Sequence, residues 1–373
     1  MNKKAIIAGH ICVDITPVFP NNTKNDIREL LQPGKLIHVG KADVHTGGAV
    51  ANTGLAMKFL GADTMLMGKV GDDAFGHMVL DILKEHGAAE HMLISPELST
   101  SYSVVLAVPG IDRIFLHNPG ANDSFRSEDI PEKMLEEAAL FHFGYPPIMR
   151  SMYENDGEEL LKIMMRAKKA GTATSLDMAA IDPDSDAGHA DWEKILARVL
   201  PYVDFFVPSA EELCFMLDRE RYLSWQARAE GRDMMETLDI EKDIKPLADR
   251  CLDLGAKIIV IKCGKPGMYY RTAGKEDLAG IGSKAGLNPL VWSDQEGFEK
   301  SYIPEKVLSG TGAGDTSIAA FLTAMLEGCP PKECLQLSAA TGACCVTSYD
   351  ALSGLKSFDF LRNKIRQGWK KNE

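Results

Sequence analysis

The sequence lacks any stretch of about eighteen uncharged apolar residues, the length that a membrane-spanning helix requires. Its eight cysteines form no C-x-x-C pair and no spacing with histidine that is typical of a metal site. The short apolar run that follows the N-terminal lysines is interrupted by His10 and Asp14, too early for a signal peptide. These absences predict a reducing, cytoplasmic location without membrane contact and without structural disulfides.

Two nucleotide-binding motifs are also missing. No G-x-x-x-x-G-K-[ST] P-loop occurs, and the alternating glycines near the C-terminus read G-x-G-x-G, not the dinucleotide fingerprint G-x-G-x-x-G. Positive charge is scarce as well, since 41 Lys and Arg face 53 Asp and Glu, giving a net charge of −12. Because phosphate backbones select basic surfaces, this balance argues against nucleic acid and anionic membranes as partners. A small phosphate-bearing ligand stays compatible, since it needs only a local pocket.

The 373 residues, 45% hydrophobic and 25% charged, have the composition of a soluble globular protein. Short β-rich runs alternate with helical patterns, which predicts an α/β fold with a mostly parallel sheet covered by helices on both faces. The strand candidates are 5–8, 64–70, 140–143, 172–176, 205–207 and 257–261. The helix candidates are 49–60, 74–86, 157–170, 190–200, 210–217 and 246–254.

Two regions, about 12–46 and 100–118, break this rhythm. In the second, two extended runs flank residues 109–112, Pro-Gly-Ile-Asp, which is a hairpin signal. We expect both regions to form a small β-sheet lid over the carboxyl ends of the strands, within a single domain that spans residues 1–373. Three further stretches have the composition of insertions: 182–191, the charged and helical 219–243, and 273–300, which has little periodicity.

The most informative segment is the octapeptide 309–316, Ser-Gly-Thr-Gly-Ala-Gly-Asp-Thr. An amphipathic helical pattern begins directly after it, at Ile318. A glycine turn at a helix start directs backbone N–H groups and the positive end of the dipole at one point, so it can hold an anion. Asp315 then has two interpretations. It is an ordinary first-turn acid, or it is a base that takes a proton from a hydroxyl attacking phosphorus.

A second glycine turn, Gly47-Gly48, opens the helix that contains Asn52. Paired glycines allow a ligand to approach the backbone, and the Asn52 amide can both donate to and accept from a hydroxyl-rich ligand. Asp14 follows the first strand, where a carboxylate could bind vicinal hydroxyls. The alternatives are a plain helix start and an ordinary turn acid. His10 is typical of a partly buried histidine, and we assign it no function.

Three further segments allow a nucleotide site. Ser209 and Glu212 fit a capping box, but an acid after a strand could also hold Mg²⁺ beside phosphates. Residues 261–268, which include Lys262, Gly264 and Gly267, form either a turn around a nucleotide or a simple hairpin. A helix with small residues, including Ala340 and Ala343, suits close packing or a flat adenine ring.

Taken together, these motifs resemble those of the PfkB-type, or ribokinase-like, carbohydrate kinases from residue 6 to about residue 360. Residues 312–315, Gly-Ala-Gly-Asp, are similar to the C-terminal signature of that family. Residues 46–52 are similar to its N-terminal di-glycine motif, and 68–76 to the G-x-V-G-x-D-x-x-G run that follows. The order and spacing of all three fit.

The resemblance implies a ribokinase-like three-layer α/β/α fold whose β-sheet lid often mediates a homodimer. It also implies ATP and Mg²⁺ as cosubstrate and cofactor, with Asp315 as the base and the backbone of Gly312, Ala313 and Gly314 as the anion hole. Asp14, Gly48 and Asn52, next to Gly47, would hold the sugar. Glu212, with Ser209, would be associated with Mg²⁺ and phosphate. ATP would be bordered by Lys262, Gly264, Gly267, Ala340 and Ala343.

The sequence departs from the family pattern at two positions. Ser309 and Gly310 stand where the family commonly has Asp-Thr, and that aspartate helps to hold a monovalent cation, so potassium activation is placed in doubt. The family's Asn-x-x-Glu motif begins here with Ser209, so an amide near the nucleotide is lost.

We therefore expect an ATP-dependent kinase that phosphorylates a hydroxyl, usually a primary one, of a small carbohydrate. Arg113, Asn118 and Asn122 are candidate acceptor contacts. A nucleoside kinase is an alternative, in which the lid aromatics Tyr102, Phe115 and Phe19 would stack on a base. A polyol such as inositol is another possible acceptor. A non-catalytic sensor of sugars or nucleotides is the alternative from a different class, although such a protein has no need of a base.

Overall fold

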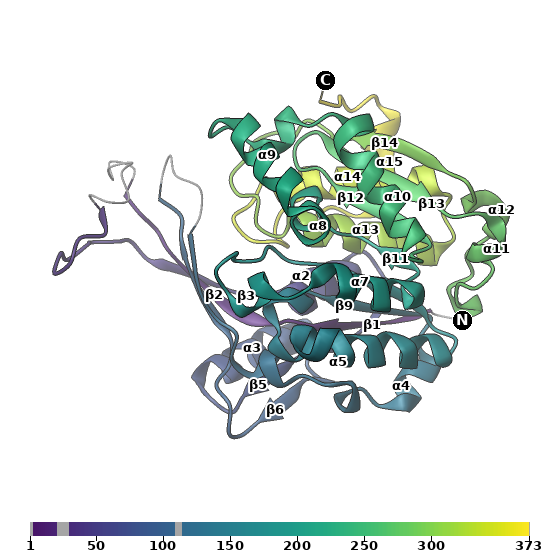
Figure 1. The fold of residues 1–373 in the computed structure, drawn as a ribbon. Coiled ribbons are helices and arrows are strands. Elements are labelled where there is room, and N and C mark those ends of the chain that lie inside the picture. Colours follow the sequence, from purple (N-terminus) through teal and green to yellow (C-terminus); the bar gives the residue numbers. More distant parts are fainter. Residues whose placement is uncertain (1–2, 21–29, 109–113, 373) are drawn as a thin grey trace.

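The structure, a computed structural model, describes residues 3–20, 30–108 and 114–372 (Figure 1). Its centre is an eight-stranded sheet with the order β14-β13-β12-β11-β10-β9-β1-β4. The strands from β4 to β12 pair in parallel, whereas β13 and β14 add an antiparallel edge. The bounds are β1 Lys4–Gly9, β4 Asp63–Met67, β9 Leu140–Gly144, β10 Ala173–Leu176, β11 Phe205–Phe206, β12 Ile258–Lys262, β13 Gly267–Thr272 and β14 Glu296–Lys300.

Helices cover both faces of this sheet, which confirms the predicted three layers (Figure 1). Along β1, Ile6 contributes to one core and Ile7 to the other, because neighbouring strand residues point to opposite faces. One face is covered mainly by α4 Glu132–Glu137, α5 Arg150–Lys169, α7 Trp192–Val199, α8 Ala210–Leu217 and α10 Lys245–Asp253. The other is covered by α2 Ala49–Phe59, α13 Ala313–Glu327, α14 Pro331–Cys345 and α15 Phe358–Arg366.

A separate four-stranded sheet, with the order β3-β2-β7-β8, projects from this body (Figure 1). Its strands are β2 Cys12–Pro17, β3 Ala42–Gly47, β7 Tyr102–Leu106 and β8 Ile114–Asn118. β7 and β8 pair antiparallel, as the hairpin signal predicts, but the turn at 109–112 and Arg113 lie outside the described residues. The base of the sheet packs on α2 and on α3 Ala74–Glu85 through residues such as Ile11, Val13 and Val79. We call this sheet the lid sheet.

The structure refines four predicted elements. The expected strand 64–70 is two strands, because the chain leaves the large sheet at Gly68 and β5 Lys69–Gly71 pairs with β6 Leu93–Ser95. The expected helix 157–170 is present after a kink: α5 is helical over 150–153, has non-helical backbone at 154–157, and is helical again to Lys169. Region 219–243 is helical, as expected, but in three pieces: α9 Arg219–Ala229, a 3-10 helix Met234–Thr237 and a π-helical turn that starts at Ile240. Region 273–300 contains β14 and two short helices, α11 Lys275–Leu278 and α12 Pro289–Trp292.

Strand β14 was missed because it lies at the sheet edge, where only Glu299 is buried, Gly297 and Phe298 are half-buried, and the charged ends stay exposed. Such a strand shows neither the alternation nor the apolar run that predicts a strand. Within the described residues, no helix has the length and apolar character that crossing a bilayer requires.

Candidate active site

A large cleft lies at the carboxyl ends of the parallel strands, between the lid sheet and the α/β body, with a volume of about 1260 Å³. Open α/β sheets bind their ligands at this edge. One part, the lid half, is lined by residues including His10, Asp14, Gly48, Asn52, Ser103 and His117. The opposite part, the C-terminal half, is lined by residues including Gly264, Gly267, Met268, Tyr302, Ala339 and Ala343. The segment 310–315 lines the cleft between the two halves.

Helix α13 begins at this segment because Gly312 has a left-handed backbone, with φ at 73°. A Cβ atom on Gly312 would stand 2.3 Å from the Cβ of Ala351, so only glycine fits. Gly312, Ala313 and Gly314 all line the cleft, and the first N–H groups of a helix lack intrahelical partners. The N-terminus of α13, at residues 312–314, is therefore suited to bind an anion, and we call it the anion place.

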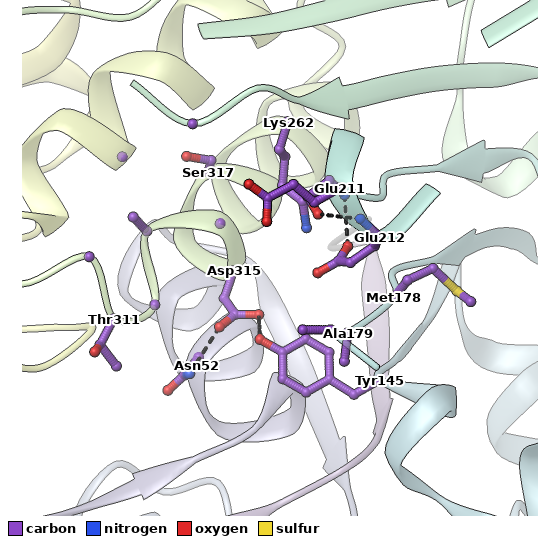
Figure 2. A pocket seen from close by; sticks show the side chains of 18 of the residues that line it. Asn52, Tyr145, Met178, Ala179, Glu211, Glu212, Lys262, Thr311, Asp315 and Ser317 are labelled. Atoms are coloured by element: carbon purple, nitrogen blue, oxygen red, sulfur yellow. Dashed lines mark hydrogen bonds between the residues drawn. The ribbon is translucent and has the colours of Figure 1, made fainter. Parts of the chain in front are cut away.

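Asp315, in the first turn of α13, is only 4% exposed and accepts two hydrogen bonds (Figure 2). The Asn52 Nδ2 donates to its Oδ2 at 2.9 Å, and the Tyr145 hydroxyl donates to its Oδ1 at 2.7 Å. Burial raises the pKa of Asp315, and the two donors offset part of that rise. Each carboxylate oxygen keeps a second lone pair, so the group can still accept a proton from a ligand.

Tyr145 follows β9 and has a left-handed backbone, with φ at 68°. A positive φ is uncommon for a residue with a side chain, and such residues gather at functional sites. Burial and the nearby Asp315 raise the pKa of the Tyr145 phenol, so it stays neutral and acts as a donor.

A buried ion pair stands beside the helix start. The Lys262 Nζ, at the end of β12, lies 2.7 Å from Oδ1 of Asp177, which follows β10. A Cβ on Gly314 would stand 3.7 Å from that Nζ, so the ammonium adds positive charge at the anion place. Burial disfavours the charged lysine, but Asp177 and Glu212 outweigh burial and raise the pKa of Lys262.

Asp177 has an unusual environment. It is fully buried, its Oδ1 also accepts the Met178 N–H at 2.8 Å, and its Oδ2 has no hydrogen-bond partner within the described part of the chain. Burial raises the pKa of Asp177 to about 7, although Lys262 opposes that rise. Its charge is thus sensitive to whatever occupies the neighbouring cleft.

Ser209 and Glu212 form the capping box of α8, since the Glu212 Oε2 accepts the Ser209 N–H at 2.8 Å and the Ser209 Oγ accepts the Glu212 N–H at 3.3 Å. Both line the cleft, as does Glu211 (Figure 2). Within the described residues, no group of three or more His, Cys, Asp or Glu could hold a metal alone. Mg²⁺ usually takes one or two carboxylates and completes its shell with water and phosphate, so a site at Glu212 fits Mg²⁺ only together with a bound nucleotide.

In the lid half, Asp14 lies on β2 and its Oδ1 accepts the Cys12 thiol at 3.3 Å. Burial raises the pKa of Asp14. His10 and His117 line the same half with their ring centroids 5.1 Å apart, and burial lowers the pKa of both, so both are neutral near pH 7. This half offers mainly uncharged hydrogen-bonding groups together with the Asp14 carboxyl.

Several predicted site residues lie away from the cleft wall. Gly47 packs against the Asp14 carboxylate, where a Cβ would stand 2.1 Å from Oδ2, so it makes room for Asp14. Ala340 is fully buried, and its neighbours Ala339 and Ala343 line the cleft. The Asn118 side chain accepts the Gly120 N–H at 3.0 Å. Arg113 lies outside the described residues.

Asn122 is fully buried and uses its amide to donate to the Ile11 carbonyl at 2.9 Å, which indicates a structural function. Of the three aromatic residues considered for base stacking, Phe115 alone lines the cleft. The ring of Tyr102 packs 5.4 Å from that of Phe75, and Phe19 is buried with Leu30.

Sequence reasoning overlooked Tyr145, Asp177, Ser103 and His117, and it assigned no function to His10. A simple signal was available for the first two, because each directly follows a predicted strand, where side chains meet at the ligand edge of the sheet. His117 and Ser103 depend on the pairing of β7 with β8, which one sequence does not reveal.

A comparison with protein families matches residues 9–357 to the pfkB family carbohydrate kinases. The chain belongs to the pfkB family. Its relatives include fructokinase-2 of Oryza sativa, 26% identical over 83% of this chain and 81% of the relative. A 5-dehydro-2-deoxygluconokinase of Clostridium perfringens is 24% identical over 96% and 91%, and an Arabidopsis thaliana ribokinase is 25% identical over 88% and 74%.

Solved structures agree with this fold. The Arabidopsis thaliana ribokinase complexed with ribose and ATP superposes with a TM-score of 0.71 at 20% identity, covering 97% of this chain and 98% of the other. Ribokinase from Giardia lamblia gives a TM-score of 0.72 at 16% identity, with 98% and 99% covered. The ribokinase-like fold is therefore confirmed. The pfkB-family chain is a sugar kinase, that is, a phosphotransferase that acts on a hydroxyl group.

Proposed function

We propose that this kinase transfers the γ-phosphoryl group of ATP to a primary hydroxyl of a small neutral sugar, with Asp315 as the general base. The observation that carries the proposal is the Asp315 carboxylate, buried and oriented by Asn52 and Tyr145 at the N-terminus of α13. A base and an anion place side by side are the two requirements for phosphoryl transfer to a hydroxyl.

In the reaction, the acceptor oxygen forms a bond to the γ-phosphorus while the bond from that phosphorus to the β,γ-bridging oxygen breaks. ADP leaves with the bridging oxygen, and Asp315 takes the hydroxyl proton. Asp14, Gly48 and Asn52 would hold the sugar, and Lys262 with the amides of Gly312 to Gly314 would neutralise the transferring group. Mg²⁺, held by the nucleotide phosphates with Glu212, would supply further neutralisation of phosphate charge.

The lid half favours a sugar over a nucleoside as the acceptor. Stacking a base needs flat apolar surfaces, and two of the three candidate aromatics, Tyr102 and Phe19, are engaged elsewhere. Neutral His10, His117 and the Ser103 hydroxyl instead offer hydrogen bonds to hydroxyl groups. A polyol would use the same groups, so the acceptor has to be identified by assay.

The deciding experiment measures ADP release with ATP and Mg²⁺ across hexoses, pentoses, polyols, sugar acids and nucleosides, each with and without K⁺. We expect one neutral sugar to stand out. We also expect less than a twofold change without K⁺, because the Ser309 hydroxyl, which donates to Thr311 Oγ1 at 3.0 Å, replaces the family's carboxylate. ATP binding without turnover on any acceptor would instead support the sensor alternative.

The Tyr145→Phe variant should shift the acid limb of the turnover profile to higher pH. Asp315 must be ionised to act as a base, so turnover rises with pH through its pKa. The Tyr145 hydroxyl stabilises the carboxylate, and its loss should raise the pKa of Asp315 further. Turnover measured across pH tests this, with Tyr349→Phe, an exposed tyrosine, as the control. An unchanged acid limb would contradict the proposed coupling.

A homodimer through the lid sheet remains a proposal. It is supported by the exposed apolar side chains of Val18 and Leu116, on strands or loops of that sheet, at 52% and 55% exposure. Light scattering of the purified protein would decide it, since a monomer at micromolar concentration would contradict it.

A further inference from the structure

Three polar side chains of the lid sheet stand in one row across its strands. Asp14 on β2 is the register partner of Ser103 on β7, and Ser103 is the register partner of His117 on β8. Register partners on neighbouring strands lie on the same face of a sheet, where their side chains can meet. All three line the lid half of the cleft, and we call them the polar row.

The hydrogen bonds along the polar row have a defined direction. Burial raises the pKa of Asp14, and hydrogen bonds from Cys12 and Ser103 oppose that rise and favour the carboxylate. A carboxylate only accepts, so the Ser103 hydroxyl spends its single proton on Asp14. The Ser103 Oγ can then only accept from the His117 Nδ1, which lies 2.9 Å away. The Nδ1 of His117 therefore carries a hydrogen.

This direction determines the tautomer of His117. The loss of solvent around the ring lowers the pKa of His117, so the ring is neutral near pH 7 and has a single N–H. With that hydrogen on Nδ1, the Nε2 keeps a lone pair and is an acceptor. His117 is exposed to the cleft, and its Nε2 has no hydrogen-bond partner among the residues that the structure describes. The ring of His10, with its centroid 5.1 Å away, packs beside His117 and helps to hold this orientation.

We propose that the Nε2 of His117 accepts a hydrogen bond from a hydroxyl of the acceptor, and thereby helps to select neutral, hydroxyl-rich sugars. This rests on the proposed function, which places the sugar in the lid half. Asp14 and His117 would both accept, so this wall suits a ligand that offers O–H donors at two positions. A carbonyl or carboxylate oxygen at His117 would face a lone pair with no proton between them, which disfavours such ligands. Ser103 is a positioning residue, because it acts through its two neighbours in the row.

The first test is NMR of the protein with ¹⁵N-labelled histidine, in which the ring nitrogens of His117 are assigned with the His117→Phe variant. We expect a protonated Nδ1 and a bare Nε2 near pH 7. Ser103→Ala removes the acceptor that fixes the Nδ1 hydrogen, so the Nε2–H tautomer should appear in that variant. D-fructose, D-ribose and myo-inositol are then added one at a time to the wild type. At least one of them should displace the Nε2 resonance, with or without turnover.

The second test is steady-state ADP release with the same three acceptors. His117→Phe keeps a flat ring but removes the acceptor atom, so the KM for the sugar should increase roughly 3- to 30-fold. The kcat and the KM for ATP should change by less than about threefold, a split that a purely structural residue would not produce. His86→Phe, at the exposed end of α3, is the matched control and should retain wild-type values.

An Nε2–H tautomer in the wild type would overturn the inference, and so would an unchanged KM for the sugar in His117→Phe. A His117 resonance that none of the three acceptors displaces would overturn it as well, whatever the turnover. An acceptor that displaces the resonance without being phosphorylated would support the contact at His117. That result would instead count against the proposed kinase reaction.

Discussion

Replacing Asp315 with asparagine should lower turnover by about 10²–10⁴-fold, the contribution that general acid–base catalysis typically makes. Asparagine has the shape of aspartate, its one oxygen can still accept from Asn52, and its NH2 group can donate to the Tyr145 hydroxyl oxygen, so the fold and the binding of both substrates should persist. Only the capacity to take a proton is lost. Steady-state ADP release and the two Michaelis constants test this, because the loss should appear in kcat and not in KM.

A matched control for this change is Asp81→Asn on the surface of α3, where the side chain is 71% exposed. It should retain wild-type turnover. Near-normal turnover of Asp315→Asn would show that Asp315 is not the general base. Catalysis would then have to depend on the positioning of the phosphoryl group by the anion place. A loss confined to KM would mean that Asp315 binds the sugar and does no proton transfer.

Replacing Lys262 with methionine should have the second largest effect, a loss of about 10²–10³-fold in turnover, as for other groups that stabilise charge in a transition state. Methionine keeps much of the packing of the lysine stem but removes the ammonium that lies beside Gly314. The KM for the sugar should change little, because Lys262 lies away from the lid half. A change below threefold in kcat would show that the ammonium does not meet the transferring group.

The same variant leaves Asp177 buried without its cation. In the wild type, Lys262 opposes the effect of burial on the pKa of Asp177, so its removal should raise that pKa further. In the native state of Lys262→Met, Asp177 would still hold its proton near neutral pH, whereas in the unfolded chain it releases that proton above its ordinary pKa of 3.8. The free energy of unfolding of Lys262→Met should therefore fall as pH increases through neutrality. Adding Asp177→Asn should remove this pH dependence without restoring turnover, which separates folding from catalysis in one comparison of melting curves and rates.

The strands that carry the site were predictable from the sequence because they are buried on both faces. Apolar runs such as 258–261 contain no polar residue, so they are readily predicted as buried strands. The carboxyl ends of these strands then mark the edge of the sheet where ligands bind. The anion place was equally visible, since a left-handed helix start needs glycine at position 312. Asp315 was singled out because a carboxylate beside an anion place suggests a base, although an ordinary first-turn acid gives the same pattern.

The contacts between distant segments could not be predicted. Tyr145 reaches Asp315 across 170 residues, and its left-handed backbone has no sequence signature because it is not a glycine. The Lys262–Asp177 pair depends on the order of β10, β11 and β12 in the sheet. Ala340 was chosen over Ala339 because helix phase cannot be fixed to within one residue from small side chains alone.

The distance between Asn52 and Asp315 along the chain, 263 residues, has a consequence for synthesis. On the ribosome β1 is synthesised first, but in the folded sheet it lies between β4 and β9. About a third of the chain must therefore be synthesised after β1 before its second neighbouring strand, β9, is present. The packing of helix α2 is delayed further, because α13, which packs on it, is among the last elements synthesised. A nascent chain therefore contains Asn52 long before Asp315 is synthesised, and the hydrogen bond between the two can form only late in synthesis.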